Sequence, residues 1–368
     1  MGSKISPDPI SPRRGYIDWL RGLAILVMIE AHVVDAWTRP ADRTSTLFGW
    51  AIILGGFAAP LFLLLAGVGT ALAIDARRDR AGGEQAGAAK LWRRGWQIFG
   101  YAFLFRLQSL VLNPGAALSG LLKVDILNIM GPAIALSGAL LGRVRTLAWR
   151  LAWLGAVVCA FTLATPIVRV APWLAWLPDP VEWYLRPQPG RATFTMFPWA
   201  GFLFAGTFLG LLIALKRSAV GDRRFHLSLV AAGGLLAFCA YRLSFLPALY
   251  SQSNFWTTSP TFFFMRVGIL TMVAGLAYFW SLRPRLTTVG RYAPMERFGR
   301  SSLFVYWIHV EMVYGWFSAP LHRSLTLPQV ALAFALFALA LFGLAEFKTA
   351  LVAGRRRRMR PPVTMPAR

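Results

Sequence analysis

The first apolar segment of the chain, residues 16–37, carries ionisable side chains on one helical face. At about 100° per residue, Asp18, Arg21 and His32 fall on the same stripe. Ionisable groups are costly inside a membrane and usually line a cavity or a pathway. A neutral imidazole is a natural general base for an alcohol or amine nucleophile. The sequence therefore predicts that His32 is catalytic; the alternative is a hydrogen-bonded histidine that packs two helices together.

Two acidic neighbours and a second histidine are candidates to assist His32. Asp35 follows one turn later, close to the same face, and could fix the tautomer of His32. Glu30 points about 160° away from His32 and is a weaker candidate. His309 lies near the middle of a later apolar segment. We interpret His309 either as part of the catalytic cavity wall or as a packing residue, and the spacing does not decide between them.

Further polar side chains inside apolar segments are candidates to bind substrate or to stabilise a developing oxyanion. Each buried arginine costs about 2.5–3.5 kcal/mol on insertion scales, which partners, water or function must offset. A purely structural salt-bridge network is the alternative. The candidates are Asp18, Arg21, Arg106, Asp125, Asn128, Arg266, Ser302 and Tyr306, of which the last two share a helical face with His309.

The composition is that of a polytopic membrane protein. Hydrophobic residues make up 57% of the 368 residues, charged residues only 15%, and the mean hydropathy is +0.53. Apolar runs of about 20 residues are long enough to cross a hydrocarbon core. Backbone groups in lipid must bond within their own segment, so we predict an all-α membrane bundle of about ten transmembrane helices. The predicted spans are 16–37, 48–74, 91–112, 121–142, 147–168, 194–216, 227–247, 260–281, 298–319 and 329–351.

The net charge of +24 is explained by topology. Most of the lysine and arginine residues fall at the N-terminus, in every second loop and in the tail. The positive-inside bias therefore predicts that both termini are cytoplasmic, and a nucleic-acid partner is disfavoured. We expect a disordered N-terminus over 1–15, a single transmembrane domain over 16–352 and a basic tail over 353–368.

Metal binding is not expected, because no histidine or cysteine spacing is typical of a metal site. The two cysteines, Cys159 and Cys239, both fall inside predicted spans. We interpret them as packing residues and predict neither a disulfide nor a metal pair.

Five short motifs stand in order along the chain. They are Asp18-Trp19-Leu20-Arg21-Gly22-Leu23-Ala24 with His32, Ala59-Pro60-Leu61-Phe62-Leu63-Leu64-Leu65-Ala66-Gly67, Val124-Asp125-Ile126-Leu127-Asn128, Phe197-Pro198-Trp199, and Gly299-Arg300-Ser301-Ser302 with His309. Their order and spacing resemble the integral-membrane acyltransferase superfamily, in particular the branch related to heparan-α-glucosaminide N-acetyltransferase. The first resembles that family's Asp-x-x-Arg-Gly-x-Ala opening helix, and the second its Pro-x-Phe-x-Phe-x-x-Gly helix.

This resemblance implies acyl transfer to a hydroxyl or amine of a sugar-type acceptor. In the sugar O-acyltransferase branch, a histidine eleven residues after the motif arginine is catalytic, and His32 matches it. Trp199 is carried over from its motif as a substrate-binding candidate. The heparan enzyme has its proposed histidine in a loop after the first helix, whereas residues 33–60 here contain none. N- and O-acylation therefore both stay open.

The resemblance also implies the partners of the reaction. Acetyl-CoA or another acyl-CoA would be the co-substrate, entering from the cytoplasm without a metal. Its phosphates would lie near basic loop residues, and the acceptor would enter from the periplasm. In this interpretation the protein spans the inner membrane of a bacterium, with a homodimer as one arrangement that stays open, and Arg106 or Arg266 steadies the oxyanion. The candidate phosphate-binding residues are Arg77, Arg78, Arg93 and Arg94.

Two other classes of function stay open at this point. Intramembrane arginine and histidine also suit a proton-coupled transporter or flippase for an anionic sugar, lipid or acid. The absence of an obvious pair of broken helices counts against that class. A family member that has lost its chemistry and acts as a scaffold is the third possibility. Release of free thiol from acetyl-CoA would separate an enzyme from the other two.

Overall fold

The structure is a computed structural model, and it describes residues 15–77, 82–113, 115, 117–215, 223–282 and 294–358. Within these ranges the regular elements are α-helices and short 3₁₀ helices, with a few isolated β-bridges. The α-helices are α1 Gly15–Trp37, α2 Thr46–Gly55, α3 Ala58–Asp75, α4 Gly83–Leu112, α5 Ile126–Arg143, α6 Leu147–Val170, α7 Asp179–Glu182, α8 Met196–Leu215, α9 Arg223–Leu243, α10 Pro260–Ser281, α12 Pro294–Arg300, α13 Ser302–Tyr314 and α14 Leu327–Arg358. The 3₁₀ helices are η1 Pro40–Asp42, η2 Leu118–Leu122, η3 Pro172–Trp176 and η5 Trp316–Leu321.

The predicted all-α, multi-pass membrane fold is confirmed. In the described part of the chain, seven helical segments are long and apolar enough to cross a membrane: Thr46–Asp75, which joins α2 and α3, then α5, α6, α8, α9, α10 and Leu327–Val352 of α14. Helix α1 is not among them because it carries Asp18, Arg21, Glu30 and Asp35, and α13 has only 13 residues. The count of ten spans and the cytoplasmic termini stay predictions.

Some predicted boundaries differ from those of the structure. The span expected at 48–74 is interrupted after Gly55, where α2 ends and α3 begins at Ala58. The span expected at 298–319 is divided among α12, α13 and η5. Cys159 and Cys239 are free thiols on α6 and α9, but both side chains are exposed. They are therefore not paired in a disulfide, as predicted, and they do not pack against other helices of the described chain.

Glycines allow the helices to pack closely. Gly67 of α3 and Gly206 of α8 lie where these helices cross, and a Cβ at either position would overlap a backbone carbonyl of the other helix. Gly95 with Gly131 plays the same role between α4 and α5. In lipid, where apolar burial drives helix association little, such close backbone contact supplies much of the packing energy.

We expect Gly206→Val to destabilise the protein by at least about 1–3 kcal/mol, because a side chain cannot enter this crossing without moving a helix. Thermal unfolding in detergent measures the effect. Gly155→Val is the matched control, since nothing lies within 4 Å of a Cβ at Gly155 on α6. Equal melting temperatures for the two variants would contradict the role of this crossing.

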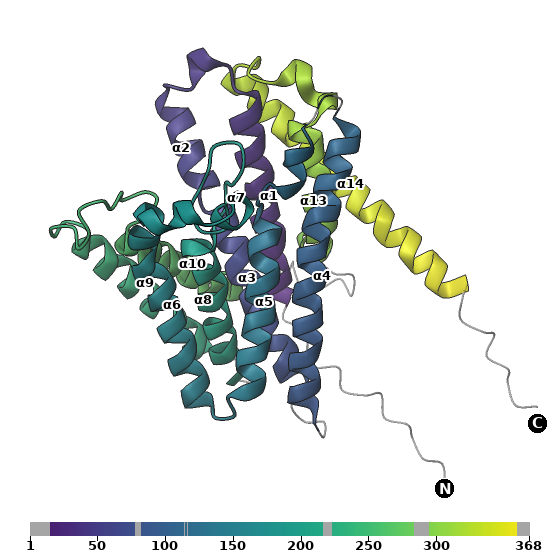
Figure 1. Cartoon of the computed structure of the whole chain (residues 1–368). Coiled ribbons are helices and arrows are strands. Elements are labelled where there is room, and N and C mark those ends of the chain that lie inside the picture. Colours follow the sequence, from purple (N-terminus) through teal and green to yellow (C-terminus); the bar gives the residue numbers. More distant parts are fainter. Residues whose placement is uncertain are drawn as a thin grey trace, which may run out of the picture.

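Helix α1 lies near the centre of the bundle and contacts α2, α3, α10, α12, α13 and α14 (Figure 1). Helices α4 and α5, α6 and α8, and α9 and α10 pack as pairs around it. Helix α14 begins beside the end of α1, where the amide of Arg39 donates to Leu325 O at 2.9 Å. It then leaves the bundle at an angle (Figure 1). The antiparallel course of α1 and α14 brings the end of one beside the start of the other.

Candidate active site

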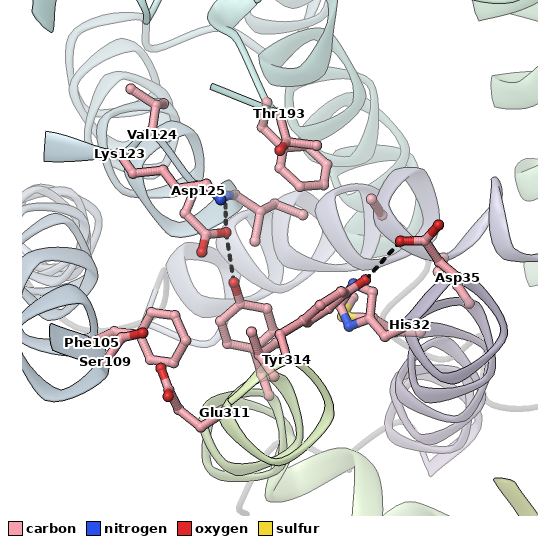
Figure 2. A pocket seen from close by; sticks show the side chains of 18 of the residues that line it. His32, Asp35, Phe105, Ser109, Lys123, Val124, Asp125, Thr193, Glu311 and Tyr314 are labelled. Carbon is pink, nitrogen blue, oxygen red and sulfur yellow. Dashed lines mark hydrogen bonds between the residues drawn. The ribbon is translucent and has the colours of Figure 1, made fainter. Parts of the chain in front are cut away.

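A cavity of about 770 Å³ lies where several helix ends meet. Its walls come from the second half of α1, the α2–α3 break, the last turns of α4, the start of α5, the start of α8 and the last turns of α13. Figure 2 shows Asp125 and Lys123 on one side of this space and His32 with Asp35 on the other. A space of this size is typical of small-molecule sites.

His32 lines the cavity and is paired with His309 behind it. His32 Nδ1 lies 3.0 Å from His309 Nε2, with the two rings nearly parallel at 14°. His309 is fully buried, and its Nδ1 lies 2.8 Å from the carbonyl oxygen of Val305. A carbonyl only accepts, so His309 Nδ1 carries the proton and the neutral ring presents Nε2 as an acceptor. His32 therefore donates from Nδ1, which leaves its Nε2 as the unprotonated nitrogen.

His309 does not line the cavity and packs between helices. Its contact with His32 Nδ1 is placed to set the tautomer of that ring. That task had been expected of Asp35. The Asp35 side chain instead faces Tyr314, whose hydroxyl donates to Asp35 Oδ2 at 3.3 Å, and Arg43, whose Nη2 donates to Oδ1 at 3.3 Å. Asp35 thus stands at the cavity wall near His32 without bonding to it.

Asp125 is the centre of a second polar cluster. It is the N-cap of α5, and Asn128 completes the capping box by accepting from the Asp125 amide at 2.9 Å. The Asp125 carboxylate accepts from Tyr306 Oη at 2.6 Å on one oxygen and from Arg106 Nη2 at 2.7 Å on the other. The backbone amide of Ile126 donates to it as well. Three helices, α4, α5 and α13, are therefore joined through one carboxylate.

Arg106 keeps one donor uncommitted in this cluster. Its Nε is buried and has no hydrogen-bond partner in the described part of the chain. Arg106 lines the cavity, and its side chain is 14% exposed. Leaving such a donor unpaired costs about 1–3 kcal/mol or more. The Nε itself is shielded from the cavity, but a guanidinium at a cavity wall is suited to an oxygen that becomes negative during a reaction.

The segment after α7 supports Asp125 from behind. Tyr184 Oη accepts from Asn128 Nδ2 at 3.1 Å, and the Val124 amide donates to Arg191 O at 2.9 Å. Burial raises the pKa of Tyr184, partly offset by its bond with Asn128. The connection from 183 to 192 thus fixes the start of α5. Trp199, at the start of α8, lines the cavity as predicted.

Several predicted residues lie elsewhere. Asp18 and Arg21 form an ion pair at 2.7 Å near the start of α1, and Asp18 also accepts from Arg300 Nε at 3.1 Å. They share a stripe with His32, but the rise of 1.5 Å per residue separates Asp18 from His32 by about 21 Å along the axis. Ser302, at the first turn of α13, does not line the cavity.

Arg266 lies behind the cavity wall. Its guanidinium carbon is 4.0 Å from the Phe262 ring centroid, and its Nε is buried without a hydrogen bond in the described part of the chain. A Cβ at Gly56 would lie 3.3 Å from Arg266 Nη2, and Gly56 lines the cavity. The arginine therefore approaches the cavity at the α2–α3 break without forming its surface.

Three of the four candidate CoA-binding arginines do not line the cavity, namely Arg77, Arg93 and Arg94. Arg93 and Arg94 are exposed on α4, and Arg94 precedes Arg106 by about 18 Å at 1.5 Å per residue. Arg77 follows the end of α3, and Arg78 lies outside the described residues. These positions leave the predicted phosphate contacts a proposal.

Six polar residues of the cavity wall are not among the predicted site residues: Ser109, Asn113, Lys123, Thr193, Glu311 and Tyr314. Lys123 stands two residues before Asp125, and Glu311 and Tyr314 follow His309 by two and five residues. Helical spacing placed Glu311 nearly opposite His309, which is consistent with only one of them lining the cavity. Proximity to a suspected site was the one signal in the sequence that could have identified Lys123.

Comparisons with known proteins identify a family for this chain. A search of curated proteins found no match. In the described part of the chain, no group of three or more histidine, cysteine, aspartate or glutamate side chains could hold a metal ion. A family model described as heparan-alpha-glucosaminide N-acetyltransferase, catalytic, matches residues 13–241, which carry His32, Arg106, Asp125 and Trp199. Because this match covers more than half of the chain, the protein belongs to the heparan-alpha-glucosaminide N-acetyltransferase catalytic-domain family.

Proposed function

We propose that the protein transfers an acyl group, in the first instance acetyl, from acyl-CoA to a hydroxyl or amine of a sugar-type acceptor, with His32 as general base. The family supports a membrane acetyltransferase type of activity. The observation that carries the proposal is the bonded chain from Val305 O through His309 to His32. That chain leaves a basic nitrogen on the one histidine that lines the cavity in the described residues.

His32 Nε2 takes the proton of the acceptor as the acceptor oxygen or nitrogen attacks the thioester carbonyl. The new bond to the acyl carbon forms, the carbon–sulfur bond breaks, and the proton passes to the departing thiolate. His309 holds the ring of His32 in the tautomer that this step needs. Because Nδ1 already donates to His309, the ring does not have to reorient between turnovers.

The Arg106 guanidinium, which lines the cavity, is our candidate donor for the oxygen that becomes negative during attack. Asp125 and Tyr306 hold the guanidinium in place, since the carboxylate bonds both side chains. A donor fixed before the reaction stabilises the transition state without further reorganisation. In this scheme Asp125 is a positioning residue.

The cavity wall supports a sugar as acceptor. Trp199, Phe194, Phe105 and Tyr314 provide aromatic surface, while Ser109 and Asn113 provide hydrogen-bonding groups. We propose that the acceptor enters at this end of the bundle from the periplasm. The donor enters from the opposite, cytoplasmic end, where Arg93 and Arg94 are available for its phosphates. Residues 16–352 then form one catalytic membrane domain in a bacterial inner membrane.

The direct test is release of free thiol from acetyl-CoA by the purified protein in nanodiscs, with a panel of amino sugars and neutral sugars. We expect thiol release that depends on one acceptor class, with the acetyl group recovered on that acceptor. Acceptor flux across the membrane without any thiol release would contradict the proposal and indicate a transporter.

His309→Phe tests the role of the buried histidine. We expect kcat to fall by about 10²-fold, the lower end of the range for general-base catalysis, because His32 loses the acceptor that sets its tautomer. KM for the acceptor should change little, since His309 does not line the cavity. Steady-state kinetics with the acceptor varied at saturating acetyl-CoA measures both values. An unchanged kcat would show that His32 needs no partner at Nδ1.

A further inference from the structure

A lysine in the cavity wall has no part in the chemistry proposed above. Lys123 follows η2 and immediately precedes Val124 and Asp125, which line the same cavity. Its side chain is half-buried. Within the described ranges it forms no ion pair and no side-chain hydrogen bond. Figure 2 shows it on the same side of the cavity as Asp125.

The surroundings of Lys123 increase the fraction of its amine that is neutral. Burial lowers the pKa of Lys123, and the Arg106 guanidinium lowers it further, while Asp125 acts in the opposite direction. Asp125 is already bonded by Tyr306, Arg106 and the Ile126 amide, so much of its charge is compensated. A neutral amine is a nucleophile, whereas an ammonium is not.

We propose that Lys123 is an acylation site, modified by the acyl-CoA bound in the cavity when no acceptor is present. This inference rests on the proposed function, because the thioester must reach this cavity. Lys123 Nζ attacks the thioester carbonyl, the nitrogen–carbon bond forms and the carbon–sulfur bond breaks. The proton released by the amine goes to the leaving thiolate, so no further reactant is needed.

The product is a stable amide, so Lys123 does not pass the acyl group on to the acceptor. Acetylation removes one positive charge beside Arg106 and adds volume to the wall of the acceptor space. We expect the modified protein to turn over more slowly. The reaction would thus act as a brake that engages when acyl-CoA is abundant and acceptor is scarce.

The chain supplies its own controls. It contains five lysines, and the structure describes three of them, Lys90, Lys123 and Lys348. Lys90 is exposed on α4, and Lys348 lies on α14 with its ammonium 4.6 Å from the Phe304 ring centroid. Neither lines the cavity. Random chemical acetylation should therefore favour the exposed Lys90.

The experiment incubates the full-length protein in nanodiscs with acetyl-CoA and no acceptor, followed by peptide mass spectrometry over time. We expect one acetyl group on Lys123, with Lys90 and Lys348 unmodified. Labelling should increase with pH as the ammonium loses its proton. The titratable or charged groups that face the same cavity are His32, Asp35, Arg106, Asp125, Tyr306, Glu311 and Tyr314. Acetylation at Lys90 as fast as at Lys123 would overturn the inference.

A kinetic readout complements the mass spectrum. Preincubation with acetyl-CoA should cause a progressive loss of transfer rate in the wild type. Lys123→Arg keeps the charge but cannot be acetylated under these conditions. Its transfer rate should therefore be the same before and after preincubation with acetyl-CoA. An equal loss in both proteins would overturn the inference.

The two proposals fail in distinguishable ways. Transfer to an acceptor without any label on Lys123 removes the acylation site and leaves the proposed function intact. Selective label on Lys123 without transfer to any acceptor supports the acylation site and removes the proposed acceptor chemistry. If the experiment detects no label on Lys123 and no transfer to any acceptor, both proposals are contradicted.

Discussion

Replacing His32 by alanine should reduce acyl transfer by about 10²–10⁴-fold, the range that a general base contributes. The variant removes the one nitrogen that the cavity presents as a proton acceptor in our scheme. His309 cannot replace it, because that ring is buried and does not line the cavity. Thiol release from acetyl-CoA with saturating acceptor measures the loss.

The matched control is His322→Ala. His322 lies after η5, where its Nε2 is 3.0 Å from Val313 O and 3.1 Å from Ser318 Oγ, and it does not line the cavity. This variant should keep most of its activity. Near-normal turnover by His32→Ala, with a melting temperature equal to that of the wild type, would remove His32 from the mechanism.

Asp125→Asn should lower both stability and activity. The carboxylate is 9% exposed and is the ion-pair partner of Arg106, whose side chain is 14% exposed. Breaking a buried pair by removing one partner costs about 3–5 kcal/mol, because the other charge stays buried without compensation. Activity should fall further than stability alone explains, since Arg106 loses the contact that holds its guanidinium at the cavity wall.

Glu346→Gln is the control for this prediction. It makes the same acid-to-amide change in the ion pair with Arg297, where the side chains are 35% and 28% exposed. A pair this accessible contributes about 0–1 kcal/mol, so its loss should shift the melting temperature little. Thermal unfolding and thiol release are measured on both variants. Equal shifts would show that the Asp125 pair is no more important than an exposed one.

The local features of the site could be predicted from the sequence. Apolar runs interrupted by His32, Arg106 and Asp125 identified these residues because charge and imidazole are costly in a membrane helix. All three line the cavity. The multi-pass helical fold followed from the same patterning, since backbone groups in lipid must bond within their own segment.

Residues that depend on pairing between helices were harder to predict. Helical periodicity gives an angle around one helix, so Asp18 and Arg21 were placed with His32, although they lie near the other end of α1. The partner of His32 was sought four residues away or less, yet it is His309, 277 positions distant. Periodicity within one helix carries no information about a contact between two helices that are so far apart in the sequence.

The sequence by itself determined that this chain folds in a membrane. It also determined which few ionisable side chains need hydrogen-bond or ion-pair partners inside the bundle. Only the tertiary structure decided how they are compensated: His309 turns the imidazole of His32, and Asp125 joins Arg106 to Tyr306. The physical reason is the distance over which each effect acts. Hydropathy and charge act on each residue where it stands, whereas hydrogen bonds over about 3 Å form only after packing has brought separate helices together.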